Sequence, residues 1–200
     1  VELFGRLYGE GTKRELLSGD LAGVGQSVRL GEVVYTLDDA VYKDGTVYAS
    51  GTIRPADGVN VVLLAEDYSV NDPAGYLLFY GEEEIPDDAP TYAELAQERG
   101  AKILHVDAIA NGVLEENGEL NASSIGYGAL PQRDGTIRFF FEFEGGESEI
   151  ARAEKYEVSV YIANWEVTPE GEWLREEPEN TWLYEDWTVT VEPQMKEDGK

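Results

Sequence analysis

Two Asp-Gly dipeptides, each set between runs of β-branched and aromatic residues, constrain this chain more than any other feature. They lie at Asp44-Gly45 in Val33–Ile53 and at Asp134-Gly135 in Tyr127–Glu144. Asp-Gly between two strands favours a two-residue type I′ turn, because both central residues must adopt positive φ. We therefore expect two β-hairpins and, since strand and turn signals fill most of the remaining chain, an all-β fold.

The first hairpin predicts its own register. A two-residue loop pairs Tyr42 with Val47 and Ala40 with Ala49, which puts small and apolar side chains on the core face. Continuing the same register would place a carboxylate, that of Asp38, on this face. We therefore expect a β-bulge near Asp38-Asp39. The β-rich run before it, Ser27–Leu37, is predicted as one strand.

The second hairpin contains the clearest alternation in the chain, with Ile137, Phe139, Phe141 and Phe143 on one face. If its loop also has two residues, Phe139 faces Leu130, Phe141 faces Gly128 and Phe143 faces Gly126. An aromatic ring across a strand glycine covers bare backbone, as a paired register requires. Two further one-sided strands are expected at Tyr156–Val167 and Trp187–Val191.

Two short helices are predicted by capping boxes, near residues 13–18 and 92–99. In each, a Thr is followed three residues later by a Glu: Thr12 with Glu15, and Thr91 with Glu94. Gly19 and Gly100 stand where a helix ends in a left-handed residue. The overall expectation is an antiparallel β-sandwich, immunoglobulin-like in shape, with an N-terminal extension at 1–26, one β-sandwich domain at 27–195 and a disordered tail at 196–200.

Charge and composition exclude several classes of function. The net charge is −26, from 41 acidic and 15 basic residues, and there is no cysteine. Such a chain lacks the basic patch that nucleic acid or an anionic membrane surface needs, so neither is an expected partner. Without cysteine there are no disulfides, thiolate metal sites or cysteine nucleophiles. The longest apolar runs, such as Val61–Ala65, are too short to span a bilayer.

No assembled catalytic motif is present, so the chain is expected not to be an enzyme and no catalytic residue is assigned. The single histidine, His105, lies among apolar residues and is predicted to be structural. Carboxylates are too numerous for two of them to be singled out as a glycosidase pair. The oxygen-rich loops Glu66–Asp72 and Glu115–Glu119 leave calcium open, but neither matches a calcium-binding motif, and no metal site or cofactor is assigned.

Aromatic residues near the C-terminus are the best candidate for a binding surface. All four tryptophans lie between Trp165 and Trp187, with Tyr161 and Tyr184 close by. Trp165 and Trp187 are predicted to pack in the core. The remaining residues are the candidate ligand-binding set: Trp173, Trp182 and Tyr184.

The segment Ser27–Pro55 (SVRLGEVVYTLDDAVYKDGTVYASGTIRP) resembles a family of uncharacterised extracytoplasmic domains from Gram-positive gut bacteria, mostly Firmicutes. These domains typically follow one transmembrane helix, and some belong to proteins similar to anti-sigma factors. The resemblance covers about the first third of the chain. It implies an immunoglobulin-like β fold, a location at the cell surface or outside the cell, and an anchor upstream of Val1; it supplies no catalytic residue.

We therefore expect a non-enzymatic extracytoplasmic domain that binds or senses a ligand or partner at the bacterial cell surface, either a protein or a glycan. A carbohydrate-binding module that uses the C-terminal aromatic residues is the alternative. An acid-catalysed glycoside hydrolase is the third and least favoured hypothesis.

Overall fold

Within the part of the chain that the structure describes, the named elements are nine strands and the helix α3. The computed structural model describes residues 11, 14, 16–74, 85–114, 120–144, 150, 153–172, 182–192 and 194, without the side chains of 120–125. The elements are β1 (Asp20–Leu30), β2 (Val33–Lys43), β3 (Thr46–Pro55), β4 (Val61–Ala65), α3 (Tyr92–Arg99), β5 (Lys102–Leu114), β6 (Leu120–Pro131), β7 (Ile137–Glu144), β8 (Tyr156–Val167) and β9 (Trp182–Val191).

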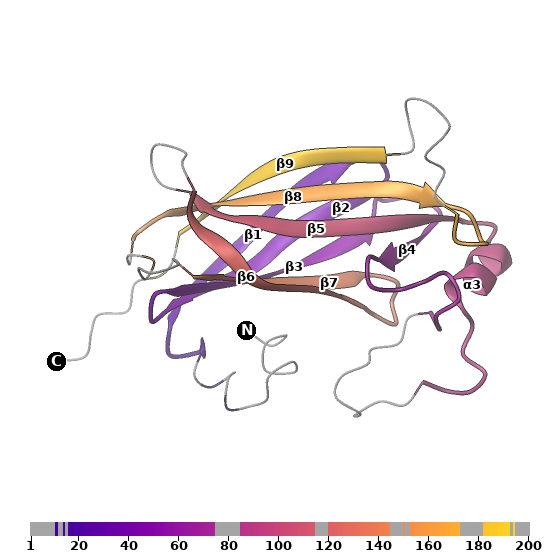
Figure 1. The fold of residues 1–200 in the computed structure, drawn as a ribbon, viewed down its shortest axis with the longest axis horizontal. Helices are drawn as coiled ribbons and strands as arrows, with labels where there is room; N and C mark the ends of the chain where they lie inside the picture. The colour runs from indigo at the N-terminus through magenta and orange to yellow at the C-terminus, as the bar shows by residue number, and fades with distance from the viewer. Residues whose placement is uncertain are drawn as a thin grey trace.

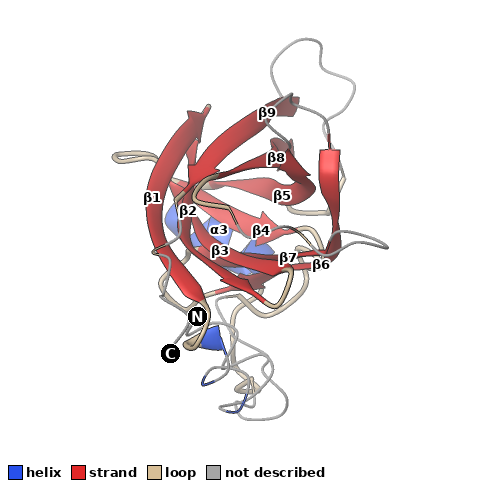
Figure 2. Ribbon diagram, turned by 90° about the vertical axis from the view of Figure 1, so that its left-hand side faces the viewer, coloured by secondary structure: helices blue, strands red, loops and turns tan. Residues whose placement is uncertain are grey.

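Backbone hydrogen bonds connect the strands in the order β1-β2-β3-β7-β6-β5-β8-β9, and β4 pairs in parallel with β5. This path folds over on itself, so that β1, β2, β3 and β7 face β5, β8 and β9 across a common interior (Figures 1 and 2). The all-β sandwich predicted from the sequence is confirmed. The sheet begins at Asp20, so the expected extension at 1–26 contributes its last residues to β1.

The two ends of this path meet through a side chain. The Gln26 amide of β1 donates to the Thr190 carbonyl of β9 over 2.5 Å and accepts from the Thr190 amide over 3.3 Å. One glutamine thus satisfies both backbone groups of an edge residue, as a neighbouring strand would do. The edge of β9 is therefore partly closed by β1.

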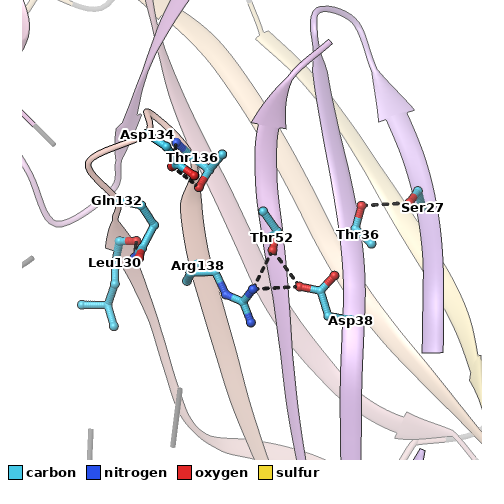
Figure 3. Close-up of polar contacts among 9 residues, drawn as sticks. All are labelled: Ser27, Thr36, Asp38, Thr52, Leu130, Gln132, Asp134, Thr136 and Arg138. Atoms are coloured by element: carbon cyan, nitrogen blue, oxygen red, sulfur yellow. Dashed lines mark hydrogen bonds and ion pairs between the residues drawn. The ribbon is translucent and has the colours of Figure 1, made fainter. Parts of the chain in front are cut away.

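The first hairpin is confirmed in every respect that the sequence predicted. Asp44 and Gly45 both have positive φ, at 49° and 80°, and Tyr42 pairs with Val47. The register shifts between Leu37 and Asp39, so the expected bulge is present. At the bulge, the carboxylate of Asp38 accepts from Thr52 over 2.7 Å and lies 3.3 Å from the Arg138 guanidinium, which joins β2, β3 and β7 (Figure 3).

The prediction of one strand over Ser27–Leu37 was wrong. The run is a hairpin in which Leu30 pairs with Val33 across a two-residue loop. Gly31 at the first loop position has φ of 59°, which a type II′ turn demands and only glycine adopts readily. A Gly-Glu pair inside an otherwise β-rich run was the available signal for this turn.

The predicted register of the second hairpin was wrong by one residue. Phe139 pairs with Ala129 and Phe141 with Tyr127, because the loop has three residues and closes between Gln132 and Thr136. In this loop Gly135 has positive φ but Asp134 does not. The carboxylate of Asp134 instead accepts from the Thr136 amide and hydroxyl over 3.0 and 2.7 Å (Figure 3), which holds the pKa of Asp134 below its usual value.

Because of this shift, strand glycines are covered by different rings from those expected. Gly128 lies against Phe140, with no room for a Cβ, and Phe143 pairs with Ser124 instead of Gly126. The core face of β7 was predicted correctly, since Ile137, Phe139, Phe141 and Phe143 are all buried.

The second predicted helix is confirmed as α3. Thr91 and Glu94 form the complete capping box, and Gly100 closes the helix in the left-handed conformation with φ of 58°. Of the other predicted helix, near residues 13–18, residues 14 and 16 are helical and 17–18 form a turn; residue 11, before the predicted start, is also helical. The capping box at Thr12 and Glu15 lies outside the described residues. Gly19 does not adopt the expected positive φ; a Cβ there would lie 2.6 Å from the Tyr42 carbonyl, so its role is close packing against β2.

Apolar side chains form two cores on opposite faces of the β5–β8 sheet. The larger core fills the interior and includes Ile137, Phe139, Phe141 and Phe143 of β7 together with Trp187, as predicted. The smaller core lies on the outside, where α3 packs its buried Tyr92 and Ala96 over Val62, Ile103 and Val167. Trp165 belongs to this outer core and is 6% exposed, so it is buried as predicted.

Candidate ligand-binding face

Among the described residues, helix α3 covers one end of the outward face of β5, β8 and β9. Strand periodicity sends alternate side chains outward, and the registers align these positions in rows across the three strands. At the end where β5 begins, α3 packs over the sheet (Figure 1). Beyond it, three successive rows run across β5, β8 and β9: His105–Trp165–Trp182, Asp107–Ala163–Tyr184 and Ile109–Tyr161–Asp186.

Four rings in these rows form what we call the aromatic face: Tyr161, Trp165, Trp182 and Tyr184. Trp165 stacks on Trp182 with ring centroids 5.1 Å apart, and Tyr161 stacks on Tyr184 at 6.3 Å. On the β5 side, His105 stacks on Trp165 at 4.6 Å. Between the two pairs, Ala163 is wholly buried. The two stacks thus lie in neighbouring rows on the outward side of the sheet, where Trp165 is buried and Trp182 and Tyr184 are exposed.

The predicted binding residues fall on this face where the structure describes them. Trp182 is 39% exposed and Tyr184 is 69% exposed, although both are large aromatic side chains. Trp173 lies outside the described residues. The structure therefore brings Trp182 and Tyr184 together and adds Tyr161 and Trp165, which the sequence had grouped with them only by proximity along the chain.

A pocket of about 470 Å³ opens at the buried end of the aromatic face. His105 and Trp165 contribute to its lining, and the chain after β4 and after β8 forms its sides with Glu66 and Glu170. Tyr68, which is half-buried, also lines it and packs edge-on against Tyr92 of α3. The pocket thus continues the aromatic surface from Trp182 toward α3.

Asp107 brings an unusual carboxyl group to this region. Parallel pairing of β4 and β5 matches Ala65 with Val106, which places Glu66 beside Asp107. Burial, followed by the charge and hydrogen bond of the neighbouring Glu66 carboxyl, raises the pKa of Asp107 to about 7. Asp107 is therefore protonated in a large fraction of molecules near neutral pH.

His105 has the opposite electrostatic property. Burial lowers its pKa to about 4, so that the imidazole is neutral at physiological pH. Its position in a stack with Trp165 fits the structural role predicted from the sequence. A neutral ring here extends the aromatic surface without adding positive charge.

The outward positions of β5, β8 and β9 contain no lysine or arginine among the residues that the structure describes. Their charged residues are Asp107, Glu157 and Asp186. Glu157 is paired with Lys155 over 3.4 Å. Asp186 is exposed and accepts a 3.4 Å hydrogen bond from the Asn111 amide. Asp186 is therefore the carboxylate of the three that places negative charge at the border of the aromatic face.

Metal ligands are not gathered in the described part of the chain, where no three histidine or acidic side chains are placed to hold an ion. In the loop that the sequence left open for calcium, the Asp72 carboxylate accepts from the Ser69 amide over 2.5 Å. The Asp72 carboxylate thus stabilises the turn formed by residues 69–72. The other loop, Glu115–Glu119, lies outside the described residues.

Sequence reasoning missed Asp107 and Glu66 as parts of the site. Asp107 could have been noticed in the sequence, because it is the one acidic residue in the apolar run Lys102–Leu114. Its neighbour Glu66 is distant along the chain and follows a different strand, β4. Comparison with protein-family models, curated proteins and solved structures finds no match for this chain. Within the described residues, no helix is long and apolar enough to cross a membrane.

Proposed function

We propose that this protein is a non-enzymatic glycan-binding domain that acts through the aromatic face. The observation that carries the proposal is the pair of stacks, Trp165–Trp182 and Tyr161–Tyr184, which leave Trp182 and Tyr184 exposed. Exposed aromatic side chains that lie together on one face mark an interaction surface, and their rings fit the apolar faces of sugar rings. Flanking carboxylates and amides supply acceptors and donors for sugar hydroxyls.

A location outside the cell is part of the same proposal. The resemblance of Ser27–Pro55 to extracytoplasmic domains supports it, and so does a −26 charge that disfavours nucleic acid as a partner. At the cell surface, polysaccharides are an abundant class of ligand. An upstream anchor would hold the aromatic face near them.

Catalysis by the Asp107–Glu66 pair is the competing hypothesis. Glycosidase carboxyls stand roughly 5–9.5 Å apart, so that a sugar bond or a water molecule fits between them. Asp107 and Glu66 instead touch through a hydrogen bond, which supports binding over hydrolysis. Incubation of oligosaccharides with the protein, followed by chromatography of the products, tests the catalytic hypothesis. Any cleavage that depends on the protein would contradict the non-enzymatic assignment.

The binding proposal is tested on a glycan array and by affinity electrophoresis, followed by isothermal titration with the best ligand. Trp182→Ala is expected to weaken binding by at least about tenfold and to lower the unfolding free energy by about 1–2 kcal/mol, because the stack on Trp165 is lost. Binding is therefore measured at a temperature where circular dichroism shows the variant to be folded. Tyr127→Ala is the matched control, since Tyr127 is an exposed aromatic residue on β6, outside the aromatic face. Retention of no glycan, or equal losses in both variants, would overturn the proposal.

A further inference from the structure

We propose that the glycan recognised by the aromatic face is cationic, with protonated amino groups on its sugar rings. This inference rests on the glycan-binding function proposed above and specifies the class of sugar. It rests on the carboxylates that surround the rings and on the lack of lysine and arginine at the described positions around them.

The charged side chains around the exposed rings are carboxylates. Asp186 stands opposite Tyr161 and two positions after Tyr184, so its exposed carboxylate borders the tyrosine stack. Glu66 and Glu170 border the pocket beside Trp165. None of the described outward strand positions or pocket-lining residues is lysine or arginine.

The charge around the rings favours some classes of sugar over others. An acidic glycan would meet carboxylates without a compensating cation, and the overall charge of −26 would oppose its approach. A neutral glycan would gain from the rings and from hydrogen bonds between its hydroxyls and the flanking carboxylates and amides, without a charge pair. A protonated amino group would gain more from the same surroundings, because aromatic faces attract cations and Asp186 supplies a charged acceptor beside them.

The arrangement of Asp186 is suited to such a contact. Its carboxylate is held from one side by the Asn111 amide at 3.4 Å, and Asn111 also donates to the Ser159 hydroxyl at 3.2 Å. A carboxylate fixed beside stacked rings loses little side-chain freedom when a ligand binds. No lysine or arginine contact of Asp186 competes within the outward rows.

The experiment compares two hexasaccharides with one backbone, a glucosamine hexamer with free amino groups and its fully N-acetylated form. Isothermal titration is performed at about pH 6, where sugar amino groups carry a proton. We expect the amino form to bind at least about tenfold more tightly at about 20 mM salt, with the difference shrinking at about 0.5 M salt.

Three variants separate the contributions. Asp186→Asn retains the acceptor for Asn111 and is expected to weaken binding of the amino hexamer only, whereas Trp182→Ala is expected to weaken binding of both. Asp44→Asn is the control, since Asp44 is an exposed carboxylate in the distant β2–β3 turn, and asparagine adopts the same positive φ. It is expected to change neither affinity.

Each outcome decides between the proposals. Equal or tighter binding of the N-acetylated hexamer, sensitive to Trp182→Ala, would overturn the cationic class and leave glycan binding intact. Equal weakening by Asp44→Asn and Asp186→Asn would reveal general attraction to an acidic protein and also overturn it. Binding of neither hexamer, together with an empty glycan array, would overturn both proposals.

Discussion

The ring of Phe139 lies against the backbone of Gly51, where β7 pairs with β3. A Cβ at position 51 would lie 2.6 Å from Cε1 of Phe139 and would also collide with the Thr36 carbonyl. Both neighbours are in the close-packed interior, so neither can move without disturbing the sheet. The absence of a side chain at Gly51 is therefore what allows three strands to approach here.

Gly51→Ala is expected to destabilise the protein by about 2–3 kcal/mol, because the methyl group overpacks this contact. Gly23→Ala is the control, since Gly23 is also a strand glycine but its Cβ would meet no atom within 4 Å. Its effect should stay within about 0.5 kcal/mol. Urea denaturation measures both; equal stabilities of the two variants would contradict the packing shown by the structure.

Tyr35→Phe is expected to cost about 1–2 kcal/mol by removing a hydrogen bond between the two layers. The buried Tyr35 hydroxyl donates to the Ala163 carbonyl over 2.7 Å and accepts from the Asn164 amide over 3.4 Å. Its burial raises the pKa of Tyr35 well above the usual value, so the phenol remains a donor. Tyr127→Phe should leave the melting temperature unchanged, because Tyr127 is 56% exposed.

Tyr35→Phe also tests the support of the aromatic face, since the Tyr35 hydroxyl donates to the carbonyl of Ala163, which lies in the row between the two ring stacks. Without the Tyr35 hydroxyl, β8 should be held less firmly at Ala163. Tyr35→Phe should therefore weaken glycan binding, but by less than Trp182→Ala does. An unchanged denaturation midpoint for Tyr35→Phe would show that the layers do not depend on this bond.

The Asp38–Arg138 pair at the bulge is expected to have a coupling energy of about 0.5–1 kcal/mol. Both side chains are 30% exposed and share the Thr52 hydroxyl, which Arg138 contacts at 3.1 Å. A double-mutant cycle with alanine at both positions measures the coupling from denaturation curves. The comparison is the exposed Arg54–Asp57 pair, whose coupling should be close to zero. Equal values would contradict a special role for the bulge.

Asp107 and His105 give stability opposite dependences on pH. Burial raises the pKa of Asp107 from 3.8 to about 7, so the folded state binds a proton more tightly and stability falls as pH rises from about 4 to 7. Burial lowers the pKa of His105 from 6.5 to about 4, so the unfolded state binds the proton and stability falls as pH drops from about 6.5 to 4. Between these limits the two contributions partly cancel.

Single variants should separate these dependences. Relative to the original protein, Asp107→Asn should make the unfolding free energy rise more steeply with pH between about 4 and 6.5, and should be relatively more stabilising at about pH 8 than at pH 4. His105→Gln should do the reverse and steepen the loss of stability as pH rises. Guanidinium denaturation across this range measures both slopes. Parallel pH profiles for the original protein and both variants would show that neither group titrates as its burial implies.

Local features were predictable from the sequence because they depend on neighbouring residues. The positive φ of Asp44 and Gly45, the Thr91–Glu94 capping box and the buried face of β7 all follow from turn chemistry or from strand periodicity. The bulge at Asp38 also followed, because a carboxylate on the core face would have been left unpaired. The all-β class rests on the sum of these local preferences.

Tertiary structure alone decided the register of β6 against β7 and the composition of the aromatic face. The Asp134-Gly135 turn permits loops of two or three residues, and the side-chain bonds to Thr136 accompany the longer one. The rows that join Asp107, Ala163 and Tyr184 connect segments far apart along the chain. Such pairings are determined by how whole layers pack, since a strand's alternation says which side chains share a face but not which strand lies beside it.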